Sequence, residues 1–203
     1  MVKLFLDGGE FMWPILGLLI VGLAFVLERF WTLTRASVNT RKFLSRIRIA
    51  LEQGGVAAAA EECEKTPGPV ASIFHAGLSR SDKGLAHVEK AITTAGSLEM
   101  AFLERGMIVL STVIVLAPML GFTGTVWGMV QAFDAIKVQN DISPAIVASG
   151  ISQALLTTLF GLIVAMIIQV FNNYFTSRID KLIIDMEESS VELIDALGDI
   201  QDK

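Results

Sequence analysis

Three long stretches of this chain carry no charged residue, and they dominate its pattern of apolar and polar positions. They cover residues 11–27, 106–133 and 142–177. A helix needs about 20 mostly apolar residues to cross the hydrocarbon of a bilayer. The first stretch reaches that length by including Phe30 and Trp31, whereas the other two exceed it and must tilt or continue into water. We therefore predict transmembrane helices over residues 11–31, 106–133 and 144–175.

The segment after the first span has the pattern of an amphipathic helix. Residues 41–64 favour helix, and Phe43, Ile47 and Leu51 recur at every fourth position, which places them on one face. The pair at residues 54–55 consists of two glycines, so we expect a break in the helix there.

Further helices fill the region before the second span. Residues 66–69, which include two prolines, predict a turn that restarts a helix over residues 70–78. Ser81 and Asp82 are suitable caps for another helix, which runs up to Arg105. We see no breaker between that helix and the second span, and we expect one long helix entering the membrane.

The third span also exceeds the membrane. It follows a short link, residues 134–143, with Ser143 as a candidate cap and Pro144 in the first helical turn. Residues 176–203 form an acidic amphipathic tail that we expect to pack as helix. The predicted fold class is an all-α membrane protein of three transmembrane helices, with the second and third extended into a cytoplasmic helical bundle.

Basic residues indicate the orientation of the chain. Six of them follow the first span between residues 29 and 48, and such clusters lie on the cytoplasmic side. Residues 1–10 and 134–143 are then external, whereas the domain at residues 32–105 and the tail are cytoplasmic. Of the 16 Lys and Arg residues, only Lys3 and Lys137 fall outside. We expect a multi-pass membrane protein with an external N-terminus and a cytoplasmic C-terminus.

Composition agrees with a membrane protein and excludes other classes. Hydrophobic residues make up 53% and charged residues 18% of the chain, and the mean hydropathy is +0.60. The net charge is −5 and no basic stripe is present, so we expect no nucleic-acid partner.

The residues that most often bind metals are few. Cys63 is the only cysteine, which excludes an intrachain disulfide, and the neighbouring acids predict an unreactive thiol. His75 and His87 have no second ligand at metal-binding spacing, although Glu61 and Glu89 could approach them by folding. We expect surface histidines, no metal site and no cofactor.

Small residues form a stripe on each of the last two spans. At 100° per residue, each of the following sets falls on one face of its helix. The second span presents Gly121, Thr125, Gly128 and Ala132, and the third presents Gly150, Ala154, Thr158, Gly161 and Ala165, with Gln153 and Thr157 beside them. Such stripes let transmembrane helices approach closely, and threonine can bond back to its own helix, so assembly alone explains them.

Polar groups deep in the spans point to a further role. They are hydroxyls and amides, with no acid or base among them: Thr123, Thr125, Gln131, Gln153, Thr157, Thr158 and Gln169. Glutamine is costly in lipid and should face protein or a wet cavity. An ion path needs a titratable group, so a carboxylate would have to come from another chain.

Two motifs resemble a known family. The sequence GTVWGM at residues 124–129, preceded by LAPMLGF and followed by QAF, and the sequence ASGISQALLTTLFGLIVA at residues 148–165, with Asn173 after it, are similar to the MotA/TolQ/ExbB proton-channel subunits. The three spans and the long insert after the first resemble the ExbB/TolQ branch.

The resemblance implies a non-enzymatic motor subunit. It implies a homopentamer whose second and third spans line a pore around helices of an ExbD/TolR-like partner, each with one membrane aspartate. Thr125 and Thr158 take the places of the threonines that face this aspartate. The remaining pore-lining candidates are Gln153, Thr157, Gly121, Gly128, Ala154 and Gly161. Proton-motive force would then energise TonB-type transport or Tol-type envelope maintenance, with a TonB/TolA-like protein as a further partner.

Departures from the family pattern keep alternatives open. Gln153 replaces the family's glutamate, which leaves H⁺ and Na⁺ both open, and Ile167 replaces a proline, which predicts a straighter third span. The alternatives are a sodium-driven or gliding-type stator and a passive membrane scaffold. An enzyme using Ser149 or Ser152 would lack a membrane base to activate the serine.

Overall fold

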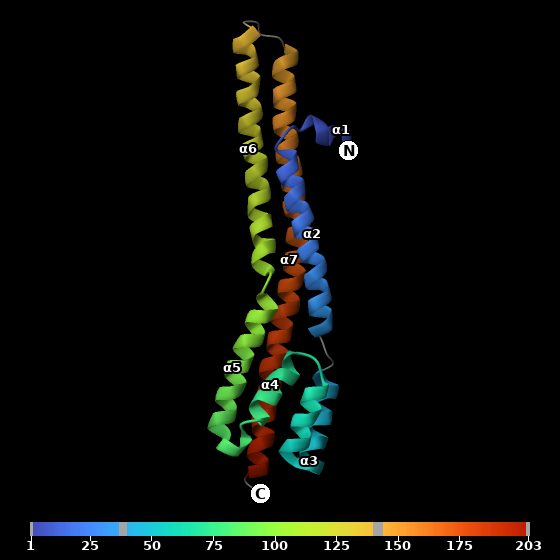
Figure 1. The fold of residues 1–203 in the computed structure, drawn as a ribbon, viewed down its shortest axis with the longest axis vertical. Coiled ribbons are helices and arrows are strands. Elements are labelled where there is room, and N and C mark those ends of the chain that lie inside the picture. The colour runs from blue at the N-terminus through green and yellow to red at the C-terminus, as the bar shows by residue number, and fades with distance from the viewer. Residues whose placement is uncertain (1, 37–39, 140–143, 202–203) are drawn as a thin grey trace. The chain divides into compact units, whose positions relative to one another are not determined.

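The computed structural model describes residues 2–36, 40–139 and 144–201, and nearly all of them are helical. Figure 1 shows the order of the elements along the chain. They are α1 (Val2–Asp7), α2 (Met12–Ala36), α3 (Thr40–Lys65), α4 (Pro69–Leu78), the short 3₁₀ helix η1 (Ser81–Lys83), α5 (Leu85–Glu104), α6 (Met107–Gln139) and α7 (Pro144–Gln201).

Three helical stretches of the described chain are long and apolar enough to cross a membrane. They lie in α2, α6 and α7, where the apolar pattern predicts them. The prediction of an all-α membrane protein with three spans is therefore confirmed.

The chain divides into two compact units. The first unit contains residues 1–28 and 106–174, and the second contains residues 29–105 and 175–203. In the first unit α2 packs closely on both other spans, because a methyl group at Gly22 would lie 2.8 Å from Ile168 of α7 and 3.4 Å from Val113 of α6. The absence of a side chain at Gly22 thus allows the three helices to meet.

The second unit has its own apolar core. The predicted face of α3 is confirmed, since Phe43, Ile47 and Leu51 are all buried. The ring of Phe43 lies 5.4 Å from that of Phe74 in α4. The predicted break is also confirmed: Gly55 has φ 68° and ψ −164°, a conformation open to glycine because it has no Cβ.

Short elements connect α4 and α5. The turn at residues 66–69 ends where α4 begins, as predicted. The prediction that Ser81 and Asp82 cap the next helix is wrong, because both lie in η1. Gly84, with φ 95°, precedes the first residue of α5. The positive φ favours glycine over a residue with a side-chain cap.

The prediction of one long helix from the second unit into the second span is also wrong. Helix α5 ends at Glu104, Arg105 has ψ 109° and Gly106 has φ 108°. A glycine takes this conformation without steric cost, and it turns the chain before α6 begins at Met107. Pro118, a stronger signal in the sequence, lies inside α6 without ending it.

A buried arginine stabilises the end of α5. The Arg29 side chain is 4% exposed, and its Nη1 donates a hydrogen bond of 3.0 Å to the Leu103 carbonyl oxygen. The last carbonyls of a helix have no hydrogen-bond donor within the helix and carry partial negative charge. A guanidinium supplies both a donor and a positive charge. Sequence reasoning used Arg29 only to orient the chain and missed this role.

Helix α7 is unbroken over 58 residues and begins at Pro144, as predicted. It stays helical through Ile167, where the family's proline is absent. Helix α6 continues to Gln139, so most of the predicted link at residues 134–143 is helical. The candidate cap Ser143 lies outside the described residues.

Candidate functional site: the contact between α6 and α7

The two stripes of small residues pack against each other within the first unit. A methyl group at Gly121 would lie 2.9 Å from the Thr157 carbonyl oxygen, and one at Gly161 would lie 2.5 Å from the Ala117 carbonyl oxygen. Both distances are shorter than a carbon normally allows. The backbones of α6 and α7 are therefore in direct contact, as small residues permit.

The same contact continues toward the far end of both helices. A methyl group at Gly128 would lie 3.2 Å from the Gly150 carbonyl oxygen and 3.3 Å from the Cβ of Ala154, which is buried. The neighbouring helix of the same chain therefore fills the space beside four small residues: Gly121, Gly128, Ala154 and Gly161. The sequence identified these four positions but could not show which helix fills the space.

Two adjacent threonines of α7 bind one carbonyl of α6. The single hydroxyl hydrogen of Thr157 is shared between two carbonyl oxygens, that of Ala154 at 2.8 Å and that of Gly121 at 3.3 Å. The hydroxyl of Thr158 donates to the Gly121 oxygen at 3.1 Å. Thr157 is 1% exposed, whereas Thr158 is half-buried and keeps part of its side chain on the surface of the pair.

Thr125 is the other half-buried threonine of the site. Its hydroxyl donates to the Phe122 carbonyl oxygen of its own helix at 2.6 Å. Because the hydrogens of Thr125 and Thr158 are both used by carbonyls, each hydroxyl presents its lone pairs as acceptors. Such groups can accept a hydrogen bond from a protonated carboxyl. They can donate to a carboxylate only after releasing the carbonyl.

Gln153 lies against the turn between α1 and α2. Gly9 has φ 74°, and a methyl group there would collide with the side-chain nitrogen of Gln153. Near this turn Phe11 packs against Trp127 of α6, with ring centroids 6.4 Å apart. The contact of Gln153 with Gly9 has no signal in the sequence, because it depends on where the N-terminal turn folds back.

The chemistry available in the spans is neutral. The stretches at residues 11–27, 106–133 and 142–177 hold no acid, base or histidine. Among the described residues no three potential metal ligands come together. The site can therefore offer hydroxyls, amides and close helix packing, but it cannot titrate.

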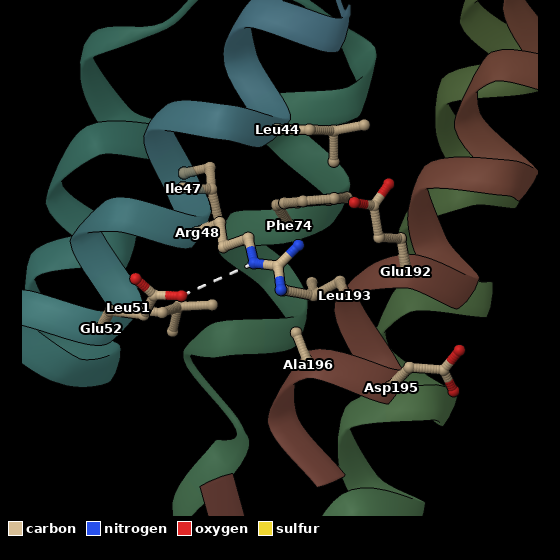
Figure 2. A pocket seen from close by; sticks show the side chains of 10 residues that line it. All are labelled: Leu44, Ile47, Arg48, Leu51, Glu52, Phe74, Glu192, Leu193, Asp195 and Ala196. Carbon is tan, nitrogen blue, oxygen red and sulfur yellow. Dashed lines mark ion pairs between the residues drawn. The ribbon is translucent and has the colours of Figure 1, made fainter. Parts of the chain in front are cut away.

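A separate cavity of about 300 Å³ lies in the second unit, as Figure 2 shows. Its walls come from α3, α4 and α7 and combine apolar side chains, including Ile47, Phe74 and Leu193, with four charged ones. Arg48 is one of the charged residues that line it and pairs with Glu52, at 3.6 Å between Nε and Oε1 (Figure 2). None of the predicted site residues lines this cavity.

The lone cysteine and one histidine also lie in the second unit. Cys63 is buried, and burial, followed by the charge of Glu62, raises the pKa of its thiol to about 12. The prediction of an unreactive thiol is confirmed, although burial outweighs the acids on which the prediction rested. His75 lies on the surface of α4 with its Nε2 3.2 Å from Glu64 Oε1.

Alkylation of Cys63 should be slow and should depend steeply on pH. The thiolate is the reacting form, and with a pKa of about 12 it is rare at pH 8. We expect iodoacetamide to modify the folded protein roughly a thousandfold more slowly than the unfolded chain. The rate should rise about tenfold per pH unit as long as the fold persists. Mass spectrometry of the labelled protein measures this, and equal rates before and after unfolding would contradict it.

Three apolar helices, a close contact through glycines and uncharged polar groups within the spans are typical of a polytopic membrane protein. The sequence model of the MotA/TolQ/ExbB proton channel family matches residues 65–188, which include the break at Gly106 and both stripes of small residues. This chain belongs to that family, within its ExbB/TolQ branch.

Individual relatives agree with this placement. The chain is 35% identical to a biopolymer transport protein ExbB homologue of Methanothermobacter thermautotrophicus, over 95% of this chain and 67% of the relative. It is 34% identical to the biopolymer transport protein ExbB of Xanthomonas campestris pv. campestris strain B100, over 68% of this chain and 51% of the relative. It is also 34% identical to the Tol-Pal system protein TolQ of Pseudomonas aeruginosa, over 50% of this chain and 44% of the relative.

Proposed function

We propose that this chain is the channel-forming subunit of an ion-driven motor. Five copies surround the helices of an ExbD/TolR-like single-span partner that carries a membrane aspartate. Proton-motive force drives this assembly to energise an outer-membrane process of the TonB or Tol type, through a TonB/TolA-like protein. The chain itself acts without enzymatic chemistry.

The observation that carries the proposal is the state of Thr125 and Thr158. Both are half-buried hydroxyls in spans without acids or bases, and both direct their hydrogen to a carbonyl. A protonated partner aspartate could donate to either oxygen without breaking a bond in this chain. Donation to an ionised aspartate would first require a hydroxyl to release its carbonyl. These spans hold no cationic side chain to compensate a buried carboxylate, so the site favours the neutral partner.

The packing of α6 on α7 supports a rigid wall for such a pore. Gly121, Gly128, Ala154 and Gly161 hold the two helices together, so their contribution to the pore is structural. In this proposal the surfaces beside the contact, with Thr125 and Thr158, face the partner. Thr157 is buried within the wall and positions Gly121, and Gln153 supports the N-terminal turn.

The proposed topology follows the basic residues. Residues 1–10 and 134–143 are periplasmic, residues 11–31, 106–133 and 144–175 span the inner membrane, and residues 32–105 and 176–203 are cytoplasmic. The second unit is then the cytoplasmic helical bundle.

Two further functions remain compatible with specific observations. An amide at Gln153 in place of the family's carboxyl removes one titratable group, so a sodium-driven or gliding-type stator stays an alternative. The glycines Gly121, Gly128 and Gly161 all contact the other helix of the same chain, which supports a passive scaffold, because helix assembly alone would explain them.

Co-purification with a partner, followed by ion flux, tests the proposal. We expect the full chain, expressed with its neighbouring genes, to retain a single-span protein with one membrane aspartate. The complex in liposomes should take up H⁺ under a proton gradient. Uptake only under a Na⁺ gradient would favour the sodium-driven stator. Purification without any such partner, and without flux, would reject the motor.

A further inference from the structure

Two exposed tryptophans lie near the two ends of the apolar part of α2. Trp13 and Trp31 lie eighteen residues apart in this one helix, and their side chains are 63% and 74% exposed. At 1.5 Å per residue the separation is about 27 Å, close to the hydrocarbon thickness of about 30 Å. Exposed tryptophans concentrate at both membrane surfaces. The spacing and exposure of the two tryptophans are those expected of residues at the two boundaries between hydrocarbon and headgroups.

A cavity of about 370 Å³ in the second unit opens beside Trp31. Its walls come from α2, from the turn at residues 67–69 and from the end of α5, where Phe102 is half exposed. Arg35 lines it one helical turn beyond Trp31, on the same side of α2 and about 6 Å further from the hydrocarbon. With Trp31 at the edge of the hydrocarbon, Arg35 would lie at the depth of the phospholipid phosphates.

The charge of this cavity suits an anion. No carboxylate lines it, and Arg35 forms no ion pair with any residue that the structure describes. The arginine of the other cavity is different, because Arg48 is paired with Glu52 and lies near Glu192 and Asp195 (Figure 2). A guanidinium free of carboxylates at a membrane surface can bind phosphate oxygens in a bidentate manner.

We propose that the cavity beside Arg35 binds the headgroup of an anionic phospholipid. The Arg35 guanidinium binds the phosphate, and the aromatic side chains of Trp31 and Phe102 lie along the glycerol and the first acyl carbons. The occupant is a lipid rather than a free anion because the cavity combines one cation with exposed aromatic surface at the edge of the hydrocarbon. The site is distinct from the threonines of the proposed ion path.

Quenching of Trp31 by brominated lipids tests this inference. The full chain carries Trp13→Phe and Trp127→Phe, so that Trp31 alone reports on neighbouring lipid. In vesicles we expect brominated phosphatidylglycerol to bind beside Trp31 roughly fivefold more strongly than brominated phosphatidylcholine. Arg35→Gln should reduce this ratio to about one. Arg48→Gln, which removes an equal charge from the other cavity, should leave it unchanged.

Three results would overturn the inference. One is equal quenching by the two lipids in the parent, and another is an equal loss of preference in Arg35→Gln and Arg48→Gln, which would indicate a general charge effect. The third is loss of the preference on adding inorganic phosphate at constant ionic strength, because the site would then bind a free anion. Arg35 is exposed and unpaired in the described chain, so Arg35→Gln should keep the helical circular dichroism of the parent.

Discussion

Thr158→Val is expected to reduce ion flux through the assembled complex by about tenfold to a hundredfold. Valine keeps the shape of threonine but removes the oxygen that would meet the partner's carboxyl. A carboxyl without a hydrogen-bond partner in a dry pore costs about 1–3 kcal/mol, which sets the size of the loss. Assembly should survive, because the Gly121 carbonyl keeps the hydroxyl of Thr157. Ion uptake into liposomes and gel filtration of the complex measure the two quantities.

Thr123→Val is the matched control. Thr123 also bonds back to its own helix, to the Met119 carbonyl oxygen at 2.8 Å, but it is exposed and lies on the opposite side of α6 from Thr125. Flux should stay within twofold of the parent, within the ordinary effect of a surface change. Unchanged flux in both variants would show that the hydroxyl of Thr158 has no part in the ion path. An equal loss in both would show that the effect does not depend on the face of the helix.

Apolar periodicity was sufficient to predict the spans and the buried face of α3. Phe43, Ile47 and Leu51 recur at helical spacing and are buried, because a helix presents such positions to one neighbour. The break at Gly55 could be predicted for a local reason, since two successive glycines weaken a helix wherever they occur.

The end of α5 could not be predicted in this way. Gly106 begins an apolar run, and a single glycine in such a run is compatible with an unbroken helix. Its positive φ is accompanied by a hydrogen bond from Arg29 to Leu103, residues far apart in the sequence. Local patterns contain no information on such a partner.

The sequence predicted which small residues share a face of each helix, but not which helix packs against that face. Helical geometry places Gly121, Gly128 and Gly161 on defined faces, yet many helices could occupy those faces. The structure fills them with the chain's own neighbouring helix. Gln153 illustrates the same limit, since its contact with Gly9 depends on a turn more than a hundred residues away in sequence.

Gly161→Ala should be the most destabilising single methyl group added to the spans. Its Cβ would lie 2.5 Å from the Ala117 carbonyl oxygen and 3.3 Å from the Gly121 Cα. These are backbone atoms, which cannot rotate away, so α6 and α7 must separate. Overpacking of this kind costs about 1–3 kcal/mol, and we expect the midpoint of thermal unfolding in detergent to fall by roughly 5 °C.

Gly17→Ala is the matched control, because it adds a methyl group to a span at a position with open space. Gly17 lies in α2, and a methyl group there would meet no atom within 4 Å. Alanine favours helix over glycine by up to about 1 kcal/mol, so the unfolding midpoint should stay constant or rise. Equal midpoints in the two variants would contradict the backbone contact of α6 with α7. If Gly161→Ala alone is destabilised, ion flux should fall with it, because separating the helices removes the Gly121 carbonyl from both Thr157 and Thr158.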